Sequence, residues 1–174
     1  MKVIHNLEPV YNENSKVLIL GSMPSLKSRE TGFYYSHPKN RFWCTLERVY
    51  GEKIGTSIEE RKEFVLNHNI ALFDVVKSCD INSSSDSSIK NIVPNDISKI
   101  LKESQIQVIF TTGKKAYNLY YKYIFLKTKI DAIYLPSTSP ANCPKGIDEK
   151  LYEEYKEIRK YTWILKSKLI AILK

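Results

Sequence analysis

Four short runs of consecutive apolar residues most strongly limit what this chain can fold into. Each run is continuous rather than alternating with polar residues, which is typical of strands buried on both faces of a parallel sheet. The segments between the runs have a helical pattern, and strands that alternate with helices predict βαβ units with helices on both sheet faces. The four predicted strands are Val17–Leu20, Ala71–Val76, Val108–Phe110 and Ala132–Leu135.

Helices are predicted between and after these strands. Glu60 lies three residues after Ser57, which is the spacing of a capping box and indicates a helix start. The last helix is long and amphipathic, so we expect it to pack on the sheet with its Lys and Arg side chains outward. The predicted helices are Asn40–Tyr50, Ser57–Asn67, Asn95–Glu103, Lys114–Tyr123 and Asp148–Leu173, the last with apolar residues Leu151, Tyr155, Ile158, Leu165, Leu169 and Ile172.

Length and composition are those of one small domain. The chain has 174 residues, of which 43% are hydrophobic, and this is enough for one core, so we expect a single domain over residues 1–174. No stretch approaches the roughly 18 apolar residues of a membrane helix, and residues 1–11 contain no apolar signal core, which predicts a cytoplasmic protein. Cys44, Cys79 and Cys143 lie far apart without a CxxC pair, so we expect no metal site.

The charge balance favours a polyanionic partner. The formal net charge is +8 and the isoelectric point is near 9.2. Lys and Arg side chains that neutralise phosphates add binding free energy by releasing counterions. A Lys-rich solvated surface would give the same composition, so the charge supports nucleic-acid binding only together with a site.

Polar loops follow the predicted strands, where ligands of open parallel sheets bind. Three of the four loops contain glycine or proline and suit a site where the backbone approaches a ligand closely. The stretch Ser78–Asn91 is too polar and too long for a simple turn, so we expect a mobile or functional loop there. The four loops are Gly21–Ser25, the serine-rich part of Ser78–Asn91, Thr111–Gly113 and Ser137–Asn142.

The segment Gly32–Trp43 is unusually rich in aromatic and polar side chains. Phe42 and Trp43 enter a predicted helix and are expected in the core. Aromatic residues with polar tips before a helix start can stack on a base and hydrogen-bond its edge. The residues of this kind are Tyr34, Tyr35, His37 and Asn40.

Three motifs in this order resemble the uracil-DNA glycosylase superfamily. They are Gly-Ser-Met-Pro-Ser after a strand, His-Pro-Lys-Asn-Arg-Phe-Trp, and a late Ser-Thr-Ser-Pro-Ala-Asn. The resemblance covers essentially the whole chain and is strongest to the hypoxanthine (deoxyinosine) DNA glycosylase branch. It implies a three-layer α/β/α sandwich with a central four-stranded parallel sheet. It also implies a monomer that flips a deaminated base from double-stranded DNA and hydrolyses its N-glycosidic bond without a metal or cofactor.

The resemblance assigns the working amide of the His-Pro-Lys-Asn segment to Asn40. Asn40 would orient the attacking water through its amide oxygen. The best-known branches carry Asp or Asn at the position of Met23, and a thioether can neither position water nor accept a proton. The classical uracil enzymes have a His where this chain has Ser137, which argues against efficient uracil excision.

The resemblance also implies which residues contact the flipped base and which contact the DNA. His37 would hydrogen-bond the base or a phosphate, or only cap the following helix. Ser137 and Ser139 would bind phosphates, while Ala141 and Asn142 would border the gap that the flipped base leaves. The base-binding candidates are Gly21, Ser22, Met23, Tyr34, Tyr35, His37 and Ser137, and the DNA-binding candidates are Ser25, Lys39, Arg41, Ser139, Pro140, Ala141 and Asn142.

Two acidic residues, Asp74 and Asp86, and several other functions are the alternatives to this mechanism. We expect Asp74 to end a strand and cap a turn, and Asp86 to cap or help bind DNA, neither acting as the general base. Alternatives are a uracil or G:U/T mismatch DNA glycosylase, an inactive superfamily member that only binds DNA, and a hydrolase of free nucleosides. A P-loop at Thr112–Lys115 is rejected, because Val108 and Lys115 occupy positions that need Gly and Ser or Thr.

Overall fold

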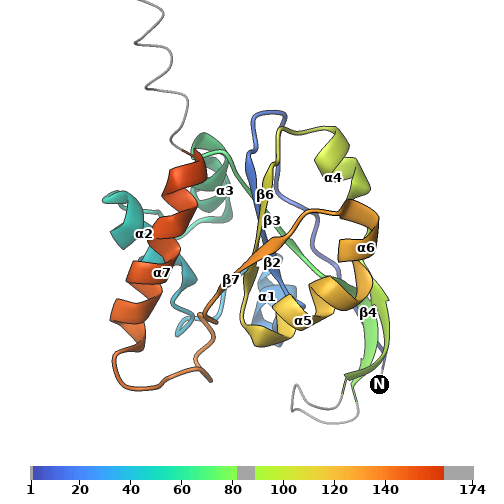
Figure 1. Ribbon diagram of the computed structural model, residues 1–174. Helices are drawn as coiled ribbons and strands as arrows, with labels where there is room; N and C mark the ends of the chain where they lie inside the picture. The colour runs from blue at the N-terminus through green and yellow to red at the C-terminus, as the bar shows by residue number, and fades with distance from the viewer. Residues whose placement is uncertain (1, 82–88, 163–174) are drawn as a thin grey trace, which may run out of the picture.

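The computed structural model describes residues 2–81 and 89–162. A central sheet of four parallel strands lies between two layers of helices (Figure 1), in the strand order β3-β2-β6-β7. This architecture confirms the predicted three-layer α/β/α sandwich and the four predicted strands, although the strand predicted over Ala71–Val76 ends at Asp74 and Val76 begins a strand of a second sheet. The strands are β2 (Val17–Gly21), β3 (Ile70–Asp74), β6 (Val108–Thr112) and β7 (Ala132–Leu135).

The central strand β2 shows why continuous apolar runs form this sheet. Val17 of β2 pairs with Ile70 of β3 on one side and with Val108 of β6 on the other. The parallel register continues along both edges of β2. Leu18, Ile19 and Leu20 are completely buried because helices cover both faces. Burial of each of these side chains contributes about 1.5–3 kcal/mol to the free energy of folding.

Two groups of helices cover the two faces of the sheet (Figure 1). On one face, the last helix buries Leu151, Tyr155 and Ile158 against the sheet as predicted, while Leu165, Leu169 and Ile172 lie outside the described residues. None of the described helices is long and apolar enough to span a membrane. One layer holds α2 (Phe42–Tyr50), α3 (Ile58–Asn67) and α7 (Ile147–Thr162), and the other holds α4 (Ser98–Lys102), α5 (Lys114–Tyr123) and α6 (Phe125–Thr128).

Hydrogen bonds between neighbouring residues set the start of helix α3. The Ser57 hydroxyl accepts a hydrogen bond from the Glu60 N–H, and the Glu60 carboxylate accepts one from the Ser57 N–H, which confirms the capping box at α3. Helix α2 begins at Phe42 rather than at Asn40, and a short helix α1 (Leu26–Thr31) follows the first loop.

A second sheet was not expected from the sequence. Its antiparallel strands β1 (Lys2–Ile4), β4 (Val76–Ile81) and β5 (Ile89–Pro94) pair in the order β1-β4-β5. The expectation of a loop over Ser78–Asn91 is therefore wrong for its described residues. Main-chain hydrogen bonds across the sheet satisfy the backbone whatever the side chains are, so this polar sequence can form strands. The serine run and Asp86 lie outside the described residues.

Candidate active site

The carboxyl edge of the central sheet gathers most of the predicted site residues. Gly21 is the last residue of β2 and pairs with Asp74, the last residue of β3. The pairing continues past the strand ends, because the Val75 N–H donates to Gly21 O at 2.9 Å and the Val76 N–H to Ser22 O at 3.0 Å. These bonds fix the backbone of the first motif against the neighbouring strand.

Because Gly21 has no side chain, groups from two other segments occupy the space where a Cβ would lie. A Cβ on Gly21 would collide with Asp74 Oδ1, and it would lie 3.4 Å from the Tyr35 hydroxyl oxygen. The carboxylate and the phenol therefore converge over the glycine. Any side chain at this position would push the buried carboxylate away, so only glycine fits here.

Asp74 forms a buried pair with His5. The His5 Nε2 to Asp74 Oδ2 distance is 2.9 Å, and the two side chains are 2% and 5% exposed. The Leu7 N–H donates to His5 Nδ1 at 3.2 Å, so the ring proton is on Nε2, which donates to the carboxylate. Burial raises the pKa of Asp74 and the hydrogen bond from His5 opposes that rise. Asp74 ends its strand as predicted, but its side chain contacts His5, which lies outside every motif recognised in the sequence.

Met23 and Ser22 are half-buried behind this pair. The Cys79 thiol donates to the Met23 sulfur at 3.3 Å, and the Met23 side chain packs against the core. This contact matches the chemistry of a thioether, which accepts only weak hydrogen bonds. Met23 thus borders the site with an apolar surface.

The two tyrosines of the aromatic segment have different environments. Tyr34 is 2% exposed, and its hydroxyl donates to Glu8 O at 3.0 Å, so both its ring and its polar tip are used in the core. Tyr35 has a φ of 53°, stacks on Phe42 with ring centroids 3.8 Å apart, and shares a hydrogen bond with the Thr112 hydroxyl at 3.3 Å. Burial raises the pKa of Tyr35, which keeps its hydroxyl protonated at the site. Of the two, Tyr35 therefore lies in the site and Tyr34 supports it from the core.

Asn40 lies in a tight turn immediately before α2. The Asn40 N–H donates to His37 O at 2.8 Å, and the Lys39 N–H donates to His37 Nδ1 at 3.1 Å. The Asn40 Oδ1 accepts a hydrogen bond at 2.9 Å from the N–H of Phe42, the first residue of α2, which forms a side-chain turn leading into the helix. An amide oxygen has a second lone pair, so Asn40 can bind a water while it accepts this bond.

Arg41 joins this turn to the loop after β7. Its backbone N–H donates to Thr138 O at 3.1 Å, and its guanidinium donates to Ser139 O at 2.8 Å and to Asn142 O. Its Nε also lies 3.6 Å from an Asp148 carboxylate oxygen. The guanidinium therefore holds the loop in place, rather than standing free toward solvent as a phosphate contact would.

The loop at residues 137–142 is held by bonds among its own residues. The Ser139 N–H donates to Ser137 Oγ at 3.2 Å, the Ala141 N–H to Ser139 Oγ at 3.3 Å, and the Asn142 amide to Ser137 O at 2.7 Å. Gly113, with a φ of 87°, packs against this loop, because a Cβ there would lie 3.0 Å from Ser137 Cβ. Ala141 is exposed and Pro140 half-buried, so the tip of the loop faces solvent.

Ser25 caps the short helix α1 instead of remaining free. Its hydroxyl accepts a hydrogen bond from the Ser28 N–H and donates one to the Ser28 hydroxyl, both at 3.1 Å. The residue is nevertheless exposed, at the side of the first motif that faces away from the core. Its backbone and cap therefore shape the loop that a phosphate would approach.

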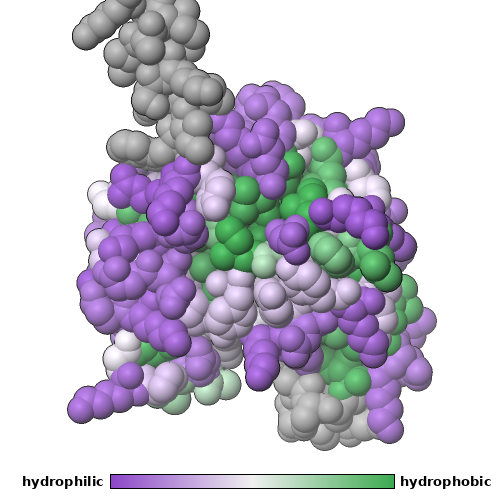
Figure 2. Space-filling view, in the orientation of Figure 1, coloured by the Kyte–Doolittle hydropathy of each residue, from purple (hydrophilic) through white to green (hydrophobic). Residues whose placement is uncertain are grey.

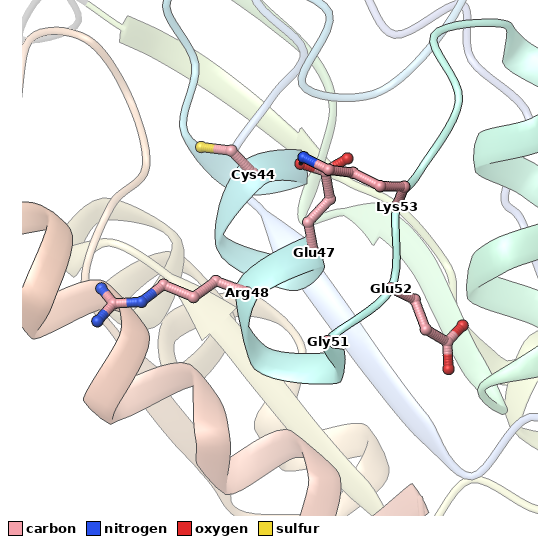
Figure 3. A pocket seen from close by; sticks show the side chains of 6 residues that line it. All are labelled: Cys44, Glu47, Arg48, Gly51, Glu52 and Lys53. Atoms are coloured by element: carbon pink, nitrogen blue, oxygen red, sulfur yellow. Dashed lines mark ion pairs between the residues drawn. The ribbon is translucent and has the colours of Figure 1, made fainter.

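A surface hollow of about 300 Å³ is lined by residues of α2 and of the segment that follows it (Figure 3). Lys53 and Glu47 form an ion pair at 3.8 Å within it, and Arg48 pairs with Glu149 of α7 at 2.8 Å. Hydrophilic side chains also dominate the surface over α2 and α7 (Figure 2). The hollow offers no aromatic ring on which a base could stack, and its charges neutralise each other, so it is not a base pocket.

Comparisons with known proteins agree with the fold and identify the family. The sequence model of the Uracil DNA glycosylase superfamily matches residues 8–161. A protein named hypoxanthine DNA glycosylase from Methanosarcina acetivorans is 38% identical over 138 residues, 76% of this chain and 84% of that protein. One of the same name from Methanosarcina barkeri is 35% identical over 111 residues, 62% of this chain and 70% of that protein.

A solved structure extends the similarity to three dimensions. The solution NMR structure of a proposed uracil DNA glycosylase from Methanosarcina acetivorans superposes with a TM-score of 0.75 at 28% identity. The match covers 91% of this chain and 99% of that one. With the superfamily model matching nearly the whole described chain, this protein belongs to the uracil DNA glycosylase superfamily.

Proposed function

We propose that this protein is a monofunctional DNA glycosylase that removes deaminated bases, hypoxanthine preferred, from double-stranded DNA in base excision repair. It acts as a monomer in the cytoplasm and without a metal or cofactor. Membership of the superfamily supports the reaction class, and the names of the two Methanosarcina relatives support hypoxanthine as the base.

The link through Arg41 is the observation that carries this proposal. It holds the turn containing Asn40 directly against the loop at residues 137–142, through a backbone bond to Thr138 and side-chain bonds to Ser139 and Asn142. The working amide and the DNA-binding loop are then one rigid unit at the edge of the sheet. A flipped nucleotide whose phosphates contact the loop would bring its sugar to Asn40.

The chemistry requires little more than positioning and charge stabilisation. Water attacks the sugar carbon C1′ while the C1′–N9 bond breaks, and the bonding electrons leave with the purine. The second lone pair of the Asn40 amide oxygen accepts a hydrogen bond from that water and orients it. A neutral amide is a poor base, so departure of the base provides much of the driving force. As the C1′–O bond forms, the water gives up one proton, which passes through solvent to the departing purine anion, so the products are a C1′ hydroxyl and a neutral purine.

The remaining residues bind the base and the backbone. Tyr35 and His37 border the base, while the hydroxyls of Ser137 and Ser139, whose oxygens accept bonds within the loop, donate their O–H groups to the phosphates. Pro140, Ala141 and Asn142 fill the gap in the duplex. Gly21, Ser22 and Met23 form the wall of the pocket, and Arg41 contributes by holding the loop.

A panel of damaged duplexes tests the proposal. Purified protein without added metal is incubated with duplexes that each carry one deoxyinosine, deoxyuridine, deoxyxanthosine or normal purine, and abasic sites are then cleaved with alkali. We expect cleavage to be fastest at deoxyinosine. Cleavage led by deoxyuridine would favour a uracil enzyme, and DNA binding with no cleavage of any duplex would favour an inactive binder.

Lys39 should contribute to DNA affinity through charge alone. It is exposed, and it forms no ion pair with any residue in the described ranges. Lys39→Ala is therefore expected to weaken binding to undamaged and damaged duplexes alike, and to reduce the log–log salt slope by about 0.9. Binding titrations from low to high salt measure both effects. Lys53→Ala, which removes an exposed lysine from the hollow on α2, is the matched control and should leave the slope unchanged.

A further inference from the structure

Four neighbouring aromatic rings lie outside the pocket, on the face formed by α5, α6 and the edge strand β7. The ring centroid of Tyr117 lies 4.8 Å from that of Tyr121 and 6.0 Å from that of Tyr134, and Tyr121 lies 5.0 Å from Phe125. Tyr134 is 45% exposed, and the other three side chains are half-buried. Positions 117 and 121 are about 6 Å apart along the helix axis. These four residues form a continuous aromatic row on the surface.

The aromatic row is held in place at an open edge of the central sheet. β7 is the last strand in the order β3-β2-β6-β7, and among the described strands it pairs with β6 alone. The Tyr121 hydroxyl donates to Asp131 Oδ1 at 3.1 Å and accepts a hydrogen bond from the Ala132 N–H at 3.2 Å, which fixes this ring against the start of β7. Contiguous exposed apolar surface of this kind marks an interaction site.

The charges around the aromatic row are almost all positive. Residues 113–136 include five lysines and one acidic residue, Asp131, whose carboxylate accepts the Tyr121 hydroxyl. Lys114, Lys122 and Lys129 are exposed, and none of them forms an ion pair within residues 2–81 and 89–162. Lysines alone would protect a sheet edge from pairing, but they do not require aromatic rings beside them. Rings and lysines together match a partner with flat bases and a phosphate backbone.

The aromatic row begins next to the candidate active site. Gly113, the residue before α5, packs against Ser137, because a Cβ on Gly113 would lie 3.0 Å from Ser137 Cβ. Tyr117 lies one helical turn further along α5, and Tyr134 lies three residues before Ser137. β7, α5 and α6 lie toward the viewer in Figure 1, and Figure 2 shows pale and green side chains over them with purple ones between. A DNA strand that leaves the loop at residues 137–142 would therefore meet these rings first.

We propose that the aromatic row binds unpaired DNA, with bases stacked on the rings and phosphates near Lys114, Lys122 and Lys129. Every base has a flat π-face, so the stacking accepts any sequence. A paired duplex keeps its bases stacked on one another and cannot offer them to the rings. This inference goes beyond the proposed function, because it concerns DNA outside the pocket, where no bond is broken.

Binding of undamaged DNA tests the inference without base removal. Fluorescence anisotropy gives the affinities of the full chain for an oligothymidine of about twelve nucleotides, within the site size of such surfaces, and for a blunt undamaged duplex. The wild-type protein should bind the single strand. Tyr134→Ala should weaken that binding at least about fivefold and change duplex binding less than about twofold, which also shows that the variant is folded. Tyr134→Phe keeps the ring and should retain the wild-type affinity.

The lysines and a matched tyrosine complete the test. Lys122→Ala and Lys129→Ala should each reduce the log–log salt slope for the single strand by about 0.7. Tyr152→Ala is the control, because it removes a half-buried tyrosine of α7 whose ring is already covered by Arg48 at 3.9 Å and Lys156 at 4.8 Å. It should leave the affinity for the single strand unchanged.

Three results would overturn the inference: a wild-type protein that does not bind the single strand, wild-type affinity in Tyr134→Ala, or an equal loss in Tyr152→Ala. A wild-type dimer that binds no single strand and is dissociated by Tyr134→Ala would also overturn it, and would assign the aromatic row to a contact between copies.

The proposed function fails separately from this inference. If single-strand binding depends on Tyr134 but no base is released from deoxyinosine DNA, the aromatic row stands and the glycosylase does not. If deoxyinosine is released from a blunt duplex and Tyr134→Ala binds the single strand like wild type, the glycosylase stands and the assignment of the aromatic row is wrong.

Discussion

Asn40→Ala should reduce base release from deoxyinosine DNA by about 100-fold to 1,000-fold, the range seen when a single preorganised hydrogen-bonding group is removed from an active site. The substitution deletes the oxygen that orients the water. It also deletes the acceptor of the Phe42 N–H, and the loss of this hydrogen bond costs about 1 kcal/mol of stability. Single-turnover rates with excess enzyme separate the chemical step from binding, and thermal melting reports the loss of the hydrogen bond.

Asn40→Asp is the matched control for this prediction. Its carboxylate retains an oxygen for the Phe42 N–H and another for the water, so it should keep the stability that alanine loses and retain more activity than alanine. Loss of the hydrogen bond to Phe42 and loss of the chemical step are thereby measured apart. Full activity in Asn40→Ala would place the water elsewhere and refute the mechanism, although the superfamily membership would stand.

Local sequence patterns predicted the central sheet because each strand is buried on both faces. In β2 and β3 every residue is buried, so the apolar run and the strand coincide. The strands of the second sheet were missed for the opposite reason. β5 has no buried residue, and its pairing with β4 depends on main-chain bonds that any side chain allows. Polarity alone therefore indicated a loop where the chain forms strands.

The sequence predicted that the site residues gather at one edge of the sheet, but it did not predict their long-range partners. Motif order and strand ends were enough to place Gly21, Asn40 and Ser137 at one edge. Long-range partners left no local signal: His5 reaches Asp74 across 69 positions, and Arg41 reaches Asn142 across 101. Arg41 was therefore predicted to contact a phosphate. In the structure it donates hydrogen bonds to three backbone carbonyls of the loop at residues 137–142.

Phe42 is the core residue whose loss should damage both stability and the site. It is completely buried, stacks on Tyr35, and meets Trp43 edge-on with ring centroids 5.0 Å apart and Tyr155 at 6.4 Å. Phe42→Ala should lower the free energy of unfolding by about 3–5 kcal/mol, since it removes a large ring and leaves a cavity between helices α2 and α7. Urea denaturation measures this loss.

The same change should also loosen the base pocket, because Tyr35 loses the ring that holds it at a φ of 53°. We expect a higher KM for deoxyinosine DNA in the folded fraction of Phe42→Ala. Phe42→Leu fills most of the space and should cost about 1 kcal/mol, while Leu126→Ala, at a side chain that is 70% exposed, should change stability by less than about 0.5 kcal/mol. If Phe42→Ala and Leu126→Ala proved equally mild, the aromatic stack would not be what joins the hydrophobic core to the site.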